Sequence, residues 1–271
     1  VFDIQDVGAR FYTYIYTLHY VMEACAENDI PVVVLDRPNP NGYYIDGPVL
    51  DVNFKSFVGI HPLPIVYGMS IGEVAQMYNG EQWLKDGVQC DLTVIPCSGY
   101  DHNMTYDLPI KPSPNLPNLR SILLYPSLCL FEGTTVSIGR GTDNQFQVIG
   151  HPELTIGDYS FTPVSKPGAK HPKHENITCY GYNLQDQEID SLFDRKTIDI
   201  SYLIKFYNHL GTDHQFFLEN NFIDLLAGND QLKEQIASGL NEKEIRMTWQ
   251  DDIAKFKLIR KKYLLYPDIN E

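Results

Sequence analysis

The sequence lacks any stretch of about 18 consecutive apolar residues, so no helix is expected to span a bilayer. Basic residues are also scarce: 21 Lys and Arg stand against 35 Asp and Glu, which gives a net charge of −14. Nucleic acid and anionic membrane surfaces repel such a chain at long range, so neither is expected as a partner. The five cysteines form neither an even set for a disulfide framework nor a Cys-x-x-Cys metal spacing.

Signatures of cofactor binding are missing as well. No Gly-x-Gly-x-x-Gly follows the first apolar run, and no Gly-x-x-x-x-Gly-Lys-Ser/Thr phosphate loop occurs, so we expect no nicotinamide or nucleotide cofactor. His171, His174 and Glu175 have the spacing of metal ligands, but they lie in a Lys- and Pro-rich segment without helical periodicity. We therefore expect no metal there.

The apolar pattern that is present predicts an α/β fold. Residues 1–5 and 31–36 are apolar runs typical of strands, and residues 11–28 between them have apolar positions at helical spacing. A strand, a helix and a strand in this order indicate a parallel sheet with a right-handed crossover. A further helix begins after Ser70, and a further strand is expected over 91–96. We interpret this region as the second half of a Rossmann-like, doubly wound parallel sheet domain.

From Lys111 the chain becomes rich in proline and glycine, which is typical of a domain boundary. We therefore predict two domains, residues 1–115 and a smaller α+β domain over 116–271. The apolar run 121–130 resembles a strand, and helices are expected in the C-terminal part over 201–210, 222–227, 230–238 and 241–263. Because the chain begins inside an apolar strand, without Met or a signal peptide, we expect the natural polypeptide to continue upstream.

Polar residues follow the first two predicted strands, where open α/β sheets bind their ligands. After the first strand come Asp6, Arg10 and Tyr12, and after the second come Asp36, Arg37, Asn39 and Asn41. Carboxylates and amides suit the hydroxyls of a sugar, and an arginine suits an anionic substituent. The alternative is structural: Asp36 and Arg37 form an ion pair, and the prolines beside them only turn the chain.

A third candidate lies in the sequence FEGTTVSIGRGT, which contains Glu132, Arg140 and Thr142. Arg140 stands between two glycines, which let the backbone approach a ligand closely. The alternative is a tight turn in which Glu132 pairs locally with Arg140.

At these same motifs the chain resembles the NamZ exo-β-N-acetylmuramidases. The matching segments are VFDIQDVGARFYTYIYTL, VVVLDRPNPNG, GMSIGEVAQMYNGE, KPSPNLPNL, LYPSLCLFEGTTVSIGRGTDNQF and IDLLAGNDQLKEQI, which occur in the family's order. The resemblance implies a Rossmann-like domain joined to a smaller domain, with the active-site cleft between them. It also implies a periplasmic or secreted hydrolase that releases N-acetylmuramic acid from the non-reducing ends of peptidoglycan fragments.

The resemblance implies roles for several residues. Asp6 is the first candidate for base or stabiliser, and Glu132 is the second. Arg10 or Arg140 would bind the lactyl carboxylate of muramic acid. Asparagines would bind hydroxyls or the acetamido group, and these are Asn39, Asn41 and Asn115. The family's proposed catalytic Glu lies in a Pro-Glu-His-Gly motif that does not occur in these 271 residues, so this chain alone is expected to be inactive.

Two rival functions are compatible with the same residues. A non-catalytic module that binds amino sugars or peptidoglycan would also present a polar crevice and many aromatic rings. A hydrolase of the same fold could act on a different β-linked amino sugar.

Overall fold

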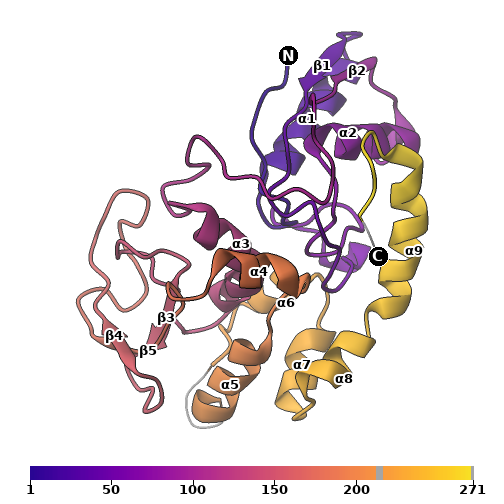
Figure 1. The fold of residues 1–271 in the computed structure, drawn as a ribbon. Helices are drawn as coiled ribbons and strands as arrows, with labels where there is room; N and C mark the ends of the chain where they lie inside the picture. Colours follow the sequence, from indigo (N-terminus) through magenta and orange to yellow (C-terminus); the bar gives the residue numbers. More distant parts are fainter. Residues whose placement is uncertain (212–215, 270–271) are drawn as a thin grey trace. The chain divides into compact units, whose positions relative to one another are not determined.

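The computed structural model describes residues 1–211 and 216–269 (Figure 1). The chain forms two compact units: Val1–Tyr106 together with Trp249–Glu271, and Asp107–Thr248. The domain boundary predicted at 115/116 differs from this division, because it assigns the residues from 249 onward to the second domain. No helix within the described ranges is long and apolar enough to cross a membrane.

The first unit contains a small parallel sheet. Strands β1 (Val32–Leu35) and β2 (Leu92–Ile95) pair in parallel. The apolar run at residues 1–5 lies beside β1 in the same direction, but it contributes only one isolated bridge, from Phe2 to Val34. The parallel arrangement predicted from the sequence is therefore present, with the first run reduced to a bridge.

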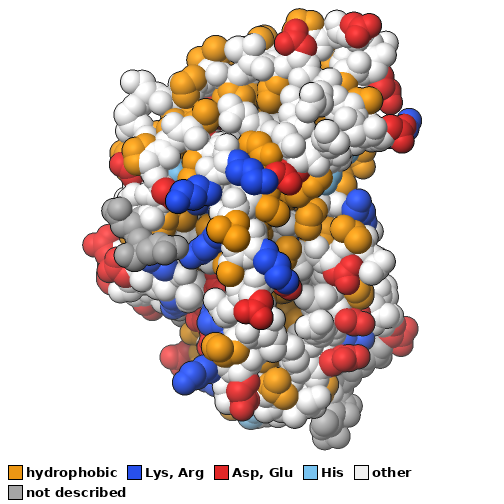
Figure 2. All heavy atoms as spheres, turned by 90° about the vertical axis from the view of Figure 1, so that its right-hand side faces the viewer, with side chains coloured by type: hydrophobic (Ala, Val, Ile, Leu, Met, Phe, Trp, Pro, Cys, Tyr) orange, Lys and Arg blue, Asp and Glu red, His pale blue; other side chains and the backbone are white. Residues whose placement is uncertain are grey.

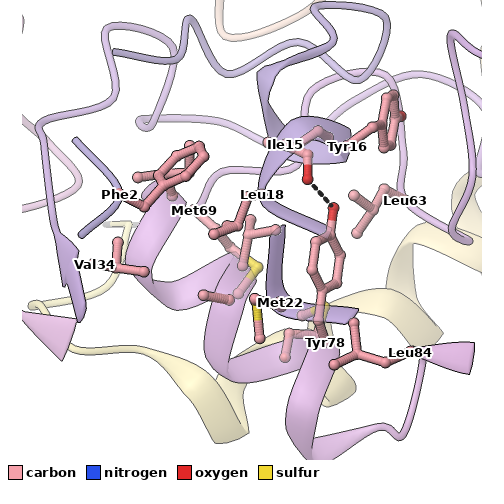
Figure 3. Close-up of a cluster of buried hydrophobic side chains, with 14 of the residues drawn as sticks. Phe2, Ile15, Tyr16, Leu18, Met22, Val34, Leu63, Met69, Tyr78 and Leu84 are labelled. Atoms are coloured by element: carbon pink, nitrogen blue, oxygen red, sulfur yellow. Dashed lines mark hydrogen bonds between the residues drawn. The ribbon is translucent and has the colours of Figure 1, made fainter. Parts of the chain in front are cut away.

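The helices of the first unit are α1 (Tyr14–Ala26), α2 (Ile71–Gly80) and α9 (Gln250–Arg260), with 3₁₀ turns at Val52–Phe54, Lys85–Gly87 and Lys261–Tyr263. Of these helices, α2 packs on both strands of the parallel sheet and α1 packs on α2. Helix α2 begins with a capping box, because Ser70 Oγ accepts from the Glu73 amide and the Glu73 carboxylate accepts from the Ser70 amide. The core includes Phe2, Leu18, Met22, Val34 and Met69, whose side chains meet in Figure 3. Burial of each such side chain stabilises the fold by about 1.5–3 kcal/mol.

The long C-terminal helix predicted over 241–263 is interrupted. It is divided into α8 (Glu242–Met247) in the second unit and α9 in the first. At the break, Thr248 Oγ1 donates to the Ile245 carbonyl at 2.7 Å, and the Trp249 indole donates to Asp46 at 3.1 Å. The periodicity of apolar residues continues through the break, which is why the sequence pattern did not reveal it.

The second unit combines an antiparallel sheet with helices. Strands β3 (Val148–His151), β5 (Cys179–Asn183) and β4 (Tyr159–Phe161) are neighbours in that order. The helices are α3 (Leu119–Leu128), α4 (Ile189–Arg195), α5 (Ser201–Leu210), α6 (Phe222–Ala227), α7 (Gln231–Ala237) and α8, and a 3₁₀ helix spans Cys129–Gly133. The chain is thus a mixed α/β protein with one parallel and one antiparallel sheet.

The prediction of a strand over residues 121–130 is wrong. Helix α3 occupies most of this run and begins at Asn118, whose side chain accepts from the Ser121 amide at 2.9 Å. All residues from Ser121 to Leu128 are buried, so the run shows no polar face that would mark helical periodicity. A short apolar run of this kind does not distinguish a buried helix from a buried strand.

Charge is mixed on the surface drawn in Figure 2. Acidic and basic side chains alternate there with hydrophobic ones. On that face the net charge of −14 is therefore not gathered into one acidic patch.

Candidate active site

Asp6 is a buried carboxyl with two different oxygen atoms. Asp6 is only 4% exposed. Oδ2 accepts from the Gly8 amide at 2.7 Å and from the Tyr67 hydroxyl. Oδ1 is shielded from solvent and makes no hydrogen bond to the described residues. One oxygen is thus fixed by the protein, and the other has no donor.

Burial raises the pKa of Asp6 to about 6. The hydrogen bonds from Tyr67 and from the Gly8 amide, together with the nearby Val7 amide, lower the pKa, but they do not offset the loss of solvent. A carboxyl with a pKa near 6 changes its charge close to neutral pH, which is the property required of a group that exchanges protons or stabilises charge in catalysis.

The loop after β1 lies against the Asp6 loop, as the sheet topology predicts. Asn41 Nδ2 donates to the Val7 carbonyl at 2.8 Å, and Asn39 Oδ1 accepts from the Asn41 amide at 2.8 Å. Gly8 has a positive φ, and a Cβ placed there would lie 2.1 Å from Asn39 Oδ1. Residue 8 must therefore be glycine for the two loops to approach this closely.

Asp36 and Arg37 do not form the ion pair considered from the sequence. The Asp36 carboxylate accepts from Ser70 Oγ and Tyr266 OH, both at 2.6 Å, and from the Gly72 amide at 2.7 Å. Burial raises its pKa. Arg37 instead pairs with Asp3 at 2.6 Å on the surface. These contacts join Asp36 to the start of α2 and to the C-terminal segment.

Arg10 and Tyr12 have contrasting surroundings. Arg10 is fully buried, and its Nη1 donates to the carbonyls of Pro48 and Leu63 at 2.9 and 2.6 Å. Burial lowers its pKa to about 10. Tyr12 is half-buried and packs edge-to-face on Tyr14, with ring centroids 5.0 Å apart.

In the second unit, Glu132 pairs with Arg140. The Nε and Nη2 atoms of Arg140 lie 2.6 and 2.5 Å from Glu132 Oε1, so the local pairing considered from the sequence is present. The side chain of Arg140 is 34% exposed and that of Glu132 is 21% exposed. The Arg140 guanidinium lies 5.2 Å from the Phe146 ring centroid. The Nη1 atom of Arg140 makes no hydrogen bond to the residues that the structure describes. The edge of the guanidinium formed by Nε and Nη2 is therefore bound to Glu132, whereas Nη1 has no hydrogen-bond acceptor among the described residues.

Thr142 and Asn115 complete the candidates of the second unit. Thr142 Oγ1 donates to the Gly139 carbonyl at 2.7 Å and so closes the turn that contains Arg140. Asn115 Nδ2 donates to the Gly168 carbonyl at 3.0 Å. Its Oδ1 is shielded and makes no hydrogen bond within the described ranges.

The segment from His171 to Glu175 contains a residue that the sequence analysis missed. Lys173 Nζ donates to the carbonyls of Phe131, Glu132 and Thr134 at 3.0, 3.1 and 2.6 Å, and burial lowers its pKa to about 8. Lys173 thereby fixes the turn that holds Glu132. Nothing in the spacing of a Lys- and Pro-rich segment indicates this contact.

The two histidines of that segment do not converge. His171 is exposed, and His174 Nε2 lies 2.7 Å from the Thr135 carbonyl oxygen. Among the described residues, no group of three or more His, Cys, Asp or Glu side chains could hold a metal ion.

Tyr67 is the second residue that the sequence analysis missed. It lies in the apolar run 63–69, where an aromatic residue is ordinary core material, so its contact with Asp6 could not be read from the pattern.

Comparison with known proteins identifies similar chains along nearly the whole length. A family model described as "Exo-beta-N-acetylmuramidase NamZ, N-terminal" matches residues 1–120, and the corresponding C-terminal model matches residues 123–266. The chain is 38% identical to the peptidoglycan beta-N-acetylmuramidase NamZ of Bacillus subtilis (strain 168), over 98% of this chain and 67% of that protein.

Two solved structures from Bacteroides fragilis NCTC 9343 are also similar, and both are of DUF1343 family proteins. The first has a TM-score of 0.94 at 51% identity and covers 98% of this chain and 74% of that one. The second has a TM-score of 0.77 at 26% identity and covers 97% and 73%.

Proposed function

This chain belongs to the NamZ family of exo-β-N-acetylmuramidases, and from that premise we propose that it is a glycoside hydrolase acting on peptidoglycan fragments. It releases terminal N-acetylmuramic acid from their non-reducing ends. Support comes from family models that together match most of the chain, and from a relative named as a peptidoglycan beta-N-acetylmuramidase.

The observation that carries the mechanism is the buried Asp6 carboxyl with its pKa near 6. Glycoside hydrolysis needs an acid for the leaving oxygen and a second group at the anomeric centre. An N-acetylated sugar can supply its own acetamido oxygen, which attacks the anomeric carbon as the bond to the leaving oxygen breaks. We assign Asp6, ionised above pH 6, to stabilise the acetamido group during this attack.

Glu132 is the weaker candidate for that role. Its carboxylate is held by two nitrogen atoms of Arg140, and its main chain is held by Lys173. A carboxylate that is already paired with an arginine stabilises a developing positive charge less strongly than an unpaired one. We therefore assign Glu132 to orienting Arg140.

Arg140 is our candidate for recognition of the lactyl carboxylate. The Nη1 atom is available, and a guanidinium binds a carboxylate through two parallel hydrogen bonds while keeping its charge. Arg10 is the weaker alternative because its Nη1 already donates to two backbone carbonyls.

The other candidate residues for sugar binding differ in how strongly the structure supports them. Asn115 offers a shielded oxygen that could accept from a hydroxyl or an amide, and Tyr12 offers a half-buried ring for stacking. Asn39, Asn41, Asp36, Arg37 and Thr142 make contacts to the protein itself, so their roles in sugar binding rest on the sequence prediction alone.

Two broader predictions accompany the proposed function. The parallel pairing of β1 with β2 and with Phe2 is compatible with half of a Rossmann-like sheet, which we propose for the first unit. A periplasmic or secreted location is proposed because the substrate lies in the cell wall.

Turnover of chromogenic glycosides by the full-length protein tests this function. We expect hydrolysis of a β-N-acetylmuramide and little hydrolysis of the matching β-N-acetylglucosaminide. Binding of the muramide without turnover would support the rival function of a sugar-binding module. Preference for the glucosaminide would support a hydrolase for a different amino sugar.

A further inference from the structure

The two oxygens of Asp6 are held unequally, and this asymmetry needs an explanation. Oδ2 has two donors, Gly8 N and Tyr67 OH, while Oδ1 is shielded and has none among the described residues. Buried polar atoms in native proteins almost always have a hydrogen-bond partner. The open Oδ1 can therefore accept a hydrogen bond from a donor that a ligand brings.

The Tyr67 hydroxyl is held rigidly in its position. Tyr67 is fully buried, and its neighbour Val66 forms an antiparallel bridge with Ala9. The Arg10 amide also donates to the Ile65 carbonyl at 2.8 Å. The segment that contains Tyr67 is thus hydrogen-bonded to the residues that follow Asp6, so the hydroxyl and the carboxyl keep their relative positions.

The groups that face Asp6 are tyrosines from each element packed around it. Tyr12 precedes α1, Tyr16 lies in α1, Tyr67 lies in the loop before α2, and Tyr78 lies in α2. Burial raises the pKa of all four, so they remain neutral where Asp6 titrates.

Arg10 is a buried cation of the same segment, and its printed contacts are to other groups. Arg10 interacts electrostatically with Tyr16 and donates to two backbone carbonyls. Asp6 is therefore the group in this cluster whose charge changes near neutral pH.

We propose that Tyr67 is a positioning residue for Asp6: with the Gly8 amide it holds Oδ2, and so it keeps Oδ1 as the oxygen that accepts from the substrate's acetamido N–H. This inference rests on the proposed function. As the acetamido oxygen attacks the anomeric carbon, its nitrogen gains positive charge, and a hydrogen bond from that N–H to a carboxylate becomes stronger. An interaction that strengthens in the transition state accelerates the reaction.

Two phenylalanine variants of the full-length protein test the proposal. Tyr67→Phe removes the hydroxyl that contacts Asp6. Tyr78→Phe is the matched control, because Tyr78 is equally buried but donates to the Ile15 carbonyl at 3.3 Å (Figure 3). The pKa of Asp6 is measured by carbon NMR of its carboxyl without substrate, and kcat/KM for the muramide is measured against pH.

We expect Tyr67→Phe to raise the pKa of Asp6 by about one unit, because the lost hydrogen bond favoured the charged form. The acid limb of kcat/KM should move to higher pH by the same amount, and kcat/KM on its plateau should fall roughly 10-fold or more. Tyr78→Phe should leave unchanged both the NMR pKa of Asp6 and the pKa of the acid limb of kcat/KM. If Tyr67→Phe does not fold, 3-fluorotyrosine at position 67 keeps the ring and strengthens the donor, so both pKa values should then fall.

The ligand atom is tested by binding of N-acetylmuramic acid and of an analogue with a hydroxyl in place of the acetamido group. Tyr67→Phe should weaken binding of the first at least several-fold more than binding of the second. Equal weakening would overturn the assignment of Oδ1 to the acetamido N–H and favour a bound water.

The remaining outcomes separate this inference from the proposed function. An unchanged Asp6 pKa in Tyr67→Phe would overturn the positioning role, even if the wild type hydrolyses the muramide. A changed Asp6 pKa with an unmoved acid limb would overturn the role of Asp6 toward substrate. A wild type without muramide turnover would contradict the proposed function, while the NMR titration would still decide whether Tyr67 positions Asp6.

Discussion

The two carboxylates singled out from the sequence, Asp6 and Glu132, have opposite surroundings. Asp6 is buried among neutral donors and tyrosines, and its pKa is raised to about 6. Glu132 is partly exposed and shares its charge with Arg140. A carboxyl buried without a cation is costly to ionise and is suited to chemistry, whereas an ion pair with one open edge is suited to recognition.

Replacing each carboxylate in turn tests whether Asp6 serves the chemistry and Glu132 serves recognition. Asp6→Asn should lower kcat for the muramide by about 10²–10⁴-fold, the usual contribution of a positioned catalytic carboxyl. Glu132→Gln should lower it much less, because that carboxylate only orients Arg140. Steady-state kinetics of the full-length protein measure both.

A buried aspartate outside the proposed site serves as the control. Asp46 is 3% exposed and accepts from the Trp249 indole. Asp46→Asn should leave kcat within a few-fold of the wild type. If Glu132→Gln is as damaging as Asp6→Asn, the roles assigned to the two carboxylates are reversed.

Asp6→Asn and Glu132→Gln should also differ in their effect on the free energy of unfolding. The folded-state pKa of Asp6 lies above its unfolded value of 3.8, so its contribution is fully present below about pH 4 and is lost as pH rises through about 6. Above pH 7 this loss amounts to about 3 kcal/mol. Asp6→Asn should therefore stabilise the protein at pH 7.5 relative to the wild type, and the gain should vanish at pH 4.

Denaturant unfolding at the two pH values measures this effect. Glu132→Gln should change the free energy of unfolding by about 1 kcal/mol or less, because its ion pair is partly exposed and screened by solvent. A stabilisation by Asp6→Asn that is equal at pH 4 and pH 7.5 would show that burial of the charge is not the cause.

The smallest expected effect concerns recognition by Arg140. Arg140→Ala should weaken discrimination between muramide and glucosaminide by about 1.5–3 kcal/mol, or roughly 10- to 150-fold in the ratio of kcat/KM values. Arg195 is the matched control: it is 33% exposed and pairs with Asp199 at 2.9 Å. Arg195→Ala should leave the ratio unchanged. Equal loss on both substrates in Arg140→Ala would mean that Arg140 is structural, and Arg10 would then be tested.

Sequence reasoning reached the parallel sheet and the joining of two polar loops, because strand periodicity and sheet topology are local and regular. It placed Asn39 and Asn41 at the same sheet edge as Asp6, and in the structure Asn41 donates to the Val7 carbonyl. It could not foresee that Tyr67 donates to Asp6 or that Lys173 holds the turn at Glu132, because such contacts depend on tertiary packing between distant segments. The misread helix α3 has the same cause: a run buried on all sides shows no period.

The ion pairs show a further limit of the sequence. Arg37 follows Asp36 directly, yet it pairs with Asp3, while Asp36 is taken up by donors from Ser70, Gly72 and Tyr266. Adjacent residues on an extended chain point away from each other, so charge neighbours in sequence are poor guides to charge neighbours in space.

The central claim is that Asp6 acts on the substrate as a carboxylate with a pKa near 6. The most direct test is the pH dependence of kcat/KM for a chromogenic β-N-acetylmuramide, measured with the full-length protein and with Asp6→Asn. The account predicts that wild-type kcat/KM rises with pH through an acid limb near pH 6, and that the residual activity of Asp6→Asn lacks this limb. An acid limb that persists unchanged in Asp6→Asn, or a wild-type profile that is flat between pH 5 and 7, would contradict it.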